Sequence, residues 1–209
     1  MPRVIEKIVY EFDELSNEAK QSARQAFVEQ PDYPYDDWWF FDEFVACAEL
    51  LGIEIDSRKN GAQIHFELHV QGAGASFTGK YRLKSDAVQA ITAHAPEDKE
   101  LHALAERLTA LQMIAALEHN DQLEADITLS GRSSHSAAMK IDVAYTGHDV
   151  YTDDLDVEQH IEEELTSVLR DFADWMYCQL LEQYGWHFSN EHVDECLQDT
   201  EFDEFGTII

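Results

Sequence analysis

The chain has 209 residues, in which 43 Asp and Glu outnumber 14 Lys and Arg, for a formal net charge of −29 at pH 7. This charge argues against direct binding to nucleic acid or to anionic membranes, because both are polyanions. Apolar residues make up 44% of the chain and aromatic residues 11%, which is too many for an acid-rich disordered chain. We therefore predict a folded protein whose partners are basic.

The first half of the chain predicts strands and helices from its hydrophobic periodicity and its turn residues. The expected elements are a strand over 4–12, a helix over 16–30 with Ser16 as N-cap, a helix over 35–51 stopped by Gly52, and strands over 62–70 and 76–83.

The second half is predicted in the same way as helices over 85–94 and 96–119, a hairpin of strands over 122–130 and 137–145, a long helix over 157–184 and a short helix over 190–197. Strands grouped in hairpins between helices predict an α+β fold, mainly an antiparallel sheet of hairpins packed against several helices, including a long C-terminal helix. We expect a single domain over 1–209 with a strongly acidic helical region over 149–209.

The C-terminal region over 149–209 concentrates the negative charge. It holds eighteen Asp and Glu and a single basic residue, Arg170, which gives 1 − 18 = −17 of the total of −29. Unpaired like charges oppose folding, so such a surface is not a requirement of the fold. It has either a solubilising role or the role of a DNA-like competitor for a basic groove.

The predicted partner-binding residues are acidic and lie on the solvent side of the long helix, in the loop before it and in the tail after it. They are Asp153, Asp154, Glu158, Glu162, Glu163, Asp171, Asp174, Glu182, Asp199, Glu201, Asp203 and Glu204.

Two other surfaces offer alternatives. The aromatic run from Tyr33 to Phe41 is suited to anchoring an interface, because aromatic side chains dominate interface hot spots. Between Ser57 and Lys84, five basic residues face a single acid, Glu67, so this hairpin contacts either a partner segment or the chain's own acidic helix.

No residue pattern is specific enough to name a reaction, so we predict no catalytic residue, no metal ligand and no cofactor. His187, His192 and Cys196 are the most ligand-like trio, but no paired-cysteine spacing supports a zinc site. Cys47 and Cys178 lie in apolar helical stretches, where a buried reduced thiol is expected. Without a signal-peptide pattern or a long apolar run, the sequence predicts a cytoplasmic protein that does not contact membranes.

The stretch from Tyr10 to Ser16, followed by Ala19-Lys20 and Ala23-Arg24, resembles the opening of a set of phage and prophage proteins. The resemblance continues in 72–77 and 170–175 and covers most of the chain. These proteins are mostly of unknown function, and some are loosely labelled antitoxins of toxin–antitoxin systems. A phage origin implies a role against host defences.

These observations favour a non-enzymatic, phage-type anti-defence protein, an acidic DNA mimic in the host cytoplasm. Its partner would be a basic, nucleic-acid-binding host protein such as a nuclease, a restriction enzyme or a CRISPR effector. The first alternative is an antitoxin that neutralises a toxin through an aromatic and acidic surface, and the second is an enzyme or metal-binding protein. The oligomeric state stays open, a homodimer included.

Overall fold

The computed structural model describes residues 7–30, 38–59, 61–68, 73–119, 122–131, 133–146 and 155–209. The predicted α+β class is confirmed by short antiparallel sheets and several helices, including the long C-terminal α5 (Leu155–His187). Where the sequence predicts a single domain over 1–209, the contacts group the chain into two compact units. We call Asp37–Leu180 the central unit, and Met1–Asp36 with Leu181–Ile209 the terminal unit.

The central unit is built on a four-stranded antiparallel sheet in the order β2-β7-β8-β9. Its strands are β2 (Ile53–Ile55), β7 (Gly79–Arg82), β8 (Leu123–Leu129) and β9 (Met139–Tyr145). The predicted hairpin over 122–145 is confirmed, with Leu123 opposite Tyr145 and Leu129 opposite Met139. Buried and solvent-facing side chains alternate along most of β8, so one face of this strand contributes to the core.

The predicted strands over 62–70 and 76–83 are each divided in the structure, and residues 69 and 70 lie outside the described residues. The pieces are β4 (Gly61–Ala62), which pairs with β3 (Ser57–Arg58), then β5 (Ile64–Glu67), which pairs with β6 (Gly74–Phe77), and β7. The breaks fall at Gln63 and Thr78, whose backbones bond to each other, Thr78 N–H donating to the Gln63 carbonyl at 3.2 Å. The chain changes its pairing partner there, which hydrophobic alternation does not reveal.

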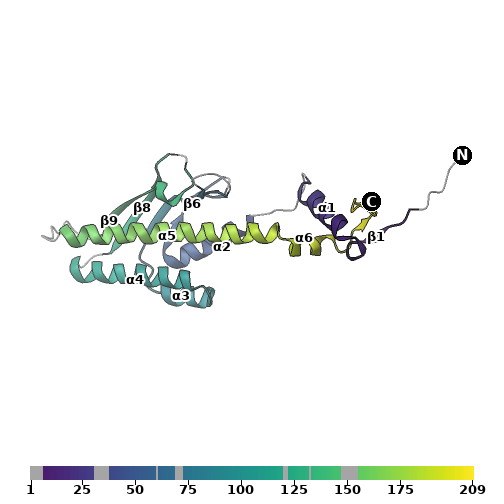
Figure 1. Ribbon diagram of the computed structural model, residues 1–209. Coiled ribbons are helices and arrows are strands. Elements are labelled where there is room, and N and C mark those ends of the chain that lie inside the picture. Colours follow the sequence, from purple (N-terminus) through teal and green to yellow (C-terminus); the bar gives the residue numbers. More distant parts are fainter. Residues whose placement is uncertain are drawn as a thin grey trace. The chain divides into compact units, whose positions relative to one another are not determined.

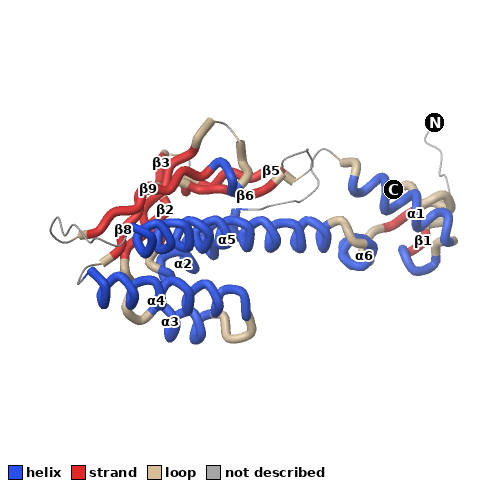
Figure 2. The backbone as a smooth tube through the Cα atoms, turned by 60° about the vertical axis from the view of Figure 1, so that its left-hand side comes forward, coloured by secondary structure: helices blue, strands red, loops and turns tan. Residues whose placement is uncertain are grey.

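Four helices of the central unit lie on the same side of its strands (Figures 1 and 2). They are α2 (Trp38–Leu51), α3 (Ala87–His94), α4 (Lys99–His119) and the part of α5 up to Leu180. The glycine predicted to stop α2 does so, since Gly52 has a φ of +85°. No helix in the described part of the chain has the length and apolar composition of a membrane span.

Apolar residues at helical spacing along 157–184 predict one buried face for the long helix, and the structure confirms it. All six side chains are at most 1% exposed: Ile161, Leu165, Val168, Phe172, Met176 and Leu180. The alternation of apolar and polar residues in the predicted strands places Phe66 and Ile127 in the core, and Ile127 is 1% exposed. Phe66 is only half-buried, and its ring packs against Phe41 with 5.7 Å between centroids.

A buried glutamine links α4 to the sheet. The Gln112 side chain accepts a hydrogen bond from Leu123 N–H at 3.0 Å and donates to the Leu123 carbonyl at 2.8 Å. Strand β7 pairs with β8 only from Glu124 onward, so the amide side chain continues the ladder where β7 ends. Gln112 also donates to the hydroxyl oxygen of buried Tyr81 at 3.2 Å. This arrangement satisfies polar groups that would otherwise be costly to bury.

Tyr81 makes the protein sensitive to alkaline pH. Burial raises the pKa of Tyr81 to about 12, from a usual value of 10.0. Below pH 10 the phenol is neutral in the folded and the unfolded chain, whereas above pH 10 the unfolded chain ionises first. We therefore expect the folded state to lose roughly 1 kcal/mol of stability at pH 11 from this group, and more toward pH 12.

Chemical denaturation at pH 8 and pH 11 measures this loss. The variant Tyr81→Phe should lose less stability over the same range, and Gln112 keeps its bonds to Leu123 in that variant. Equal losses in the two proteins would assign the alkaline sensitivity to other groups.

Two of the five basic residues between Ser57 and Lys84 pair with acids on the neighbouring strand. Lys80 pairs with Asp126 at 2.7 Å and Arg82 pairs with Glu124 at 3.3 Å, both across the exposed face of β7 and β8. These two residues therefore do not make the alternative contact with the chain's own acidic helix. Strand pairing thus neutralises two of the five basic residues in this stretch.

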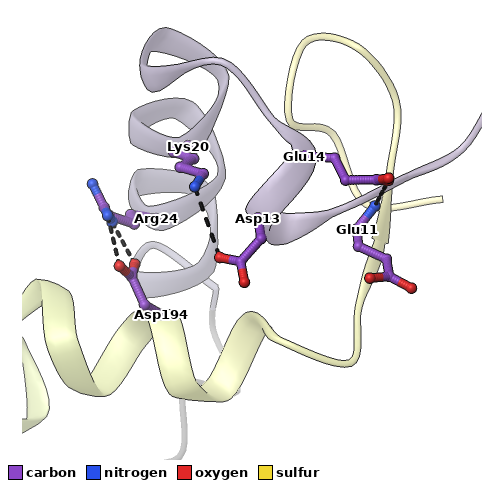
Figure 3. Close-up of polar contacts among 6 residues, drawn as sticks. All are labelled: Glu11, Asp13, Glu14, Lys20, Arg24 and Asp194. Atoms are coloured by element: carbon purple, nitrogen blue, oxygen red, sulfur yellow. Dashed lines mark hydrogen bonds and ion pairs between the residues drawn. The ribbon is translucent and has the colours of Figure 1, made fainter.

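The terminal unit joins the first helix to the last. Ser16 caps α1 (Asn17–Val28) as predicted, accepting a hydrogen bond from Ala19 N–H at 3.2 Å, and α6 (Asn190–Leu197) has the predicted bounds. Figure 3 shows the bidentate contact between Arg24 of α1 and Asp194 of α6, with distances of 2.5 and 2.7 Å. The ion pair of Lys20 with Asp13 is longer, at 3.8 Å.

The acidic tail contributes a strand to the terminal unit. The predicted strand over 4–12 is reduced among the described residues to β1 (Tyr10–Glu11), with 4–6 outside them, and β1 pairs with β10 (Glu201–Phe202). Phe202 is fully buried, and its ring centroid lies 6.0 Å from that of Phe12. Part of the acidic tail is therefore core, because Phe202 is buried although its neighbours in sequence, Glu201 and Asp203, are acidic.

Candidate functional site

The candidate site is a groove of about 520 Å³ along α5 in the central unit. Its far wall is the short helix η2 (Ser136–Ala138) with the start of β9. The lining residues are Ser136, Ala137, Ile141, Glu162, Glu163, Thr166, Ser167, Arg170, Asp171 and Asp174. Four of the acids predicted to bind a partner thus lie together in one concave surface.

Helical periodicity explains this gathering. Glu163, Arg170 and Asp174 recur at intervals of seven and four residues, so they share one face of α5. The apolar stripe that includes Leu165 and Phe172 lies on another face and is buried. The packing of the stripe therefore determines which acids point outward, and Glu162, Glu163 and Asp174 are exposed.

The charges in the groove are unequally compensated. Arg107 of α4 pairs with Asp171 at 2.5 Å and with Glu164 at 3.5 Å. One guanidinium nitrogen of Arg170 donates to the Met139 carbonyl at 2.9 Å. The three exposed acids of the groove make no ion pair to a described residue, although Glu163 accepts a hydrogen bond from Gln159 at 2.7 Å. The lining as a whole has four carboxylates against one guanidinium.

Asp171 therefore does not match the partner-binding role that the sequence predicts for it. It is half-buried, and it accepts a hydrogen bond from the Ser167 hydroxyl at 3.4 Å in addition to its ion pair. A carboxylate held by Arg107 orients α4 against α5 and is less available to a partner than the exposed acids are.

Residues 38–190 match the family model described as domain of unknown function DUF8835. The chain belongs to this family. No curated protein and no solved structure matches it. The DUF8835 match contains all the groove residues, whereas β1, α1 and β10 of the terminal unit lie outside it. The groove is thus a feature of the DUF8835 region itself.

The remaining predicted acids do not join this groove. Glu158 lies half-buried on α5, and Asp153 and Asp154 lie outside the described residues. The other five belong to the terminal unit: Glu182, Asp199, Glu201, Asp203 and Glu204. Asp203 holds a turn, because its carboxylate accepts hydrogen bonds from the backbone of Thr207 and Phe205, which lower its pKa.

The aromatic run proposed as an interface anchor lies at the start of the DUF8835 match. Residues 33–37 and the side chains of Trp38 and Trp39 lie outside the described structure. Phe40 is 5% exposed, and Phe41 contacts Phe44 and Phe66 in the core. These two phenylalanines therefore serve the packing of α2.

The trio of His187, His192 and Cys196 is close together in the terminal unit. The rings of the two histidines lie 5.0 Å apart, and Cys196 Sγ lies 3.7 Å from His192 Nε2. Burial lowers the pKa of His187, and the neighbouring His192 lowers it further. Such a shift favours the neutral imidazole.

A second group of metal-ligand side chains lies in the DUF8835 region and has no recognisable pattern in the sequence. Among the described residues, Glu43, Cys47 and His94 place their donor atoms all within 4.8 Å of one another. The spacing of Glu43 and Cys47 is a weak helical signal, and nothing in the sequence connects His94 to them.

Cys47 is buried as predicted, whereas Cys178 is exposed because it lies off the apolar stripe of α5.

Proposed function

We propose that this chain is a non-enzymatic inhibitor that binds a basic, nucleic-acid-handling protein through the α5 groove. The partner would be a host nuclease, a restriction enzyme or a CRISPR effector, and the groove would occupy its nucleic-acid site. A phage origin and a location in the host cytoplasm are part of this proposal. The observation that carries the proposal is the set of exposed carboxylates Glu162, Glu163 and Asp174 in one concave surface, without an ion pair to a described residue.

The charge density of the groove supports the comparison with a single nucleic-acid strand. From Glu162 to Asp174 the helix rises by about 18 Å, at about 1.5 Å per residue. One strand of duplex DNA carries about five phosphates over that length, whereas the whole duplex carries about ten. The groove offers four carboxylates over this distance. It therefore resembles one strand more closely than a complete duplex.

The polar lining suits lysine and arginine side chains of a partner. Hydroxyl groups of Ser136, Thr166 and Ser167 lie among the carboxylates and can accept additional hydrogen bonds from a guanidinium. Charge-assisted bonds of this kind add orientation to the long-range attraction between a negative groove and a basic surface.

The experiment that tests the function starts with capture of the partner from a bacterial lysate, followed by mass spectrometry. We expect a basic nucleic-acid-binding protein, whose affinity for this chain falls by at least about tenfold between 50 and 200 mM salt. Excess single-stranded or duplex DNA should compete with the chain. A partner that binds equally well in the presence of saturating DNA would exclude the proposal.

A further inference from the structure

A cluster of three metal-ligand side chains connects α2 and α3, away from the acidic groove. Glu43 and Cys47 lie one turn apart on α2, and His94 is the last residue of α3. His94 Nε2 lies 2.7 Å from Glu43 Oε1, and Cys47 Sγ lies 3.6 Å from the same oxygen. All three donor atoms lie within 4.8 Å of one another.

These separations approach those of a tetrahedral zinc site. With bonds of about 2.3 Å to sulfur and about 2.0–2.2 Å to nitrogen and oxygen, ligand atoms around zinc lie about 3.4–3.6 Å apart. The observed 3.6 Å between sulfur and oxygen already agrees with this geometry. The 2.7 Å hydrogen bond between Glu43 and His94 would lengthen by roughly 0.7 Å, which an exposed glutamate side chain can supply by rotation.

We propose that Glu43, Cys47 and His94 bind one zinc-type divalent metal ion, with a fourth position left for water. One thiolate, one imidazole and one carboxylate form a donor set that zinc accepts, and three protein ligands plus water complete four-coordination. The ion would fasten the end of α3 to the middle of α2. This inference does not depend on the partner-binding role of α5.

The cluster is open to solvent on one side and has a further carboxylate, that of Asp98, close to it. The side chains of Glu43 and His94 are 50% and 34% exposed, whereas Cys47 is only 1% exposed, so the ion would approach from the solvent side. Asp98 lies near enough for its charge to act on Cys47. Its carboxylate is held in place by Leu101 N–H and by Trp175 Nε1, each at 2.9 Å.

Binding must displace a proton. Burial, together with the charges of Glu43 and Asp98 and the hydrogen bond to Glu43, raises the pKa of Cys47 to about 12, so the metal-free chain carries a thiol. As the metal–sulfur bond forms, the thiol proton passes to water or buffer. A proton that His94 Nε2 shares with Glu43 would also have to leave that nitrogen, to Nδ1 or to solvent, before the Nε2 lone pair could bind the ion. Affinity should therefore increase with pH.

The test is titration of the chelator-stripped, reduced full chain with Co²⁺. We expect one equivalent to bind with a sulfur-to-cobalt charge-transfer absorption, and Zn²⁺ to displace it. Glu43→Gln and His94→Gln should each weaken binding by at least about tenfold. Loss of a residue that only hydrogen-bonds to a metal ligand already weakens metal binding by about that factor. Cys47→Ala should abolish the charge-transfer band.

A matched control separates this cluster from the rival trio. The double variant His192→Gln with Cys196→Ala removes one histidine and one cysteine from α6 and should leave the cobalt spectrum unchanged. Because Glu43 and His94 are exposed, their variants remain informative even where Cys47→Ala fails to fold. Absence of a charge-transfer band in the wild type, or a band that survives His94→Gln and disappears in the control, would overturn the proposal.

Discussion

Replacing Ile127 with Asp is expected to unfold the central unit. Ile127 lies in the middle of β8 opposite Gly79 and Ile141, and it is 1% exposed. A buried carboxylate at this position would have no positive partner, at a cost of several kcal/mol against a total stability of about 5–15 kcal/mol. Circular dichroism and thermal melting should show loss of the cooperative transition.

The adjacent residue provides the control for this prediction. Thr128 is exposed on the opposite face of the same strand, so Thr128→Asp introduces the same charge one position away. It should change the stability by about 1 kcal/mol or less. An Ile127→Asp protein that melts like the Thr128→Asp protein would show that β8 does not present Ile127 to the core.

Reversing the exposed acids of the groove is expected to abolish partner binding. The triple change of Glu162, Glu163 and Asp174 to Lys converts electrostatic complementarity into like-charge opposition with a basic partner. Binding should weaken by at least about a hundredfold. Substitutions at exposed helix positions usually change the free energy of unfolding by about 0.5 kcal/mol each, so the melting temperature should shift little. Calorimetry or surface plasmon resonance with the captured partner measures the loss.

Asp171 and Glu158 are left out of this variant for a structural reason. A lysine at position 171 would face Arg107, which now pairs with Asp171, and the resulting repulsion would disturb the packing of α4 on α5. Glu158 is half-buried on α5. If a variant that includes either residue lost binding, the loss could come from a folding defect and not from a lost contact with the partner.

The matched control reverses three acids outside the groove. Glu49, Glu97 and Glu106 are exposed on the central unit, and changing them to Lys alters the net charge by the same amount. Binding should be largely retained in this control, because local complementarity and not total charge determines the contact. Equal loss in both triple variants would indicate non-specific attraction, and no loss in either would refute the role of the groove.

Local patterns in the sequence determine much of the fold. The helical spacing of Ile161, Leu165 and Phe172 identifies the buried face of α5, and the alternation around Ile127 identifies β8. Ser16 and Gly52 mark a helix start and a helix end through their own hydrogen bonding and backbone conformation. These features depend on residues within one or two turns, so they can be predicted without tertiary contacts.

Only the tertiary structure decides which acids are available and which donor groups meet. Arg107 reaches Asp171 across 64 residues, and His94 reaches Glu43 across 51, because helix packing brings distant segments together. The change of strand partner at Thr78 and the burial of Phe202 in the acidic tail have the same origin. A sequence determines the periodicity of each element, whereas the pairing of charges depends on how elements pack, which no local pattern encodes.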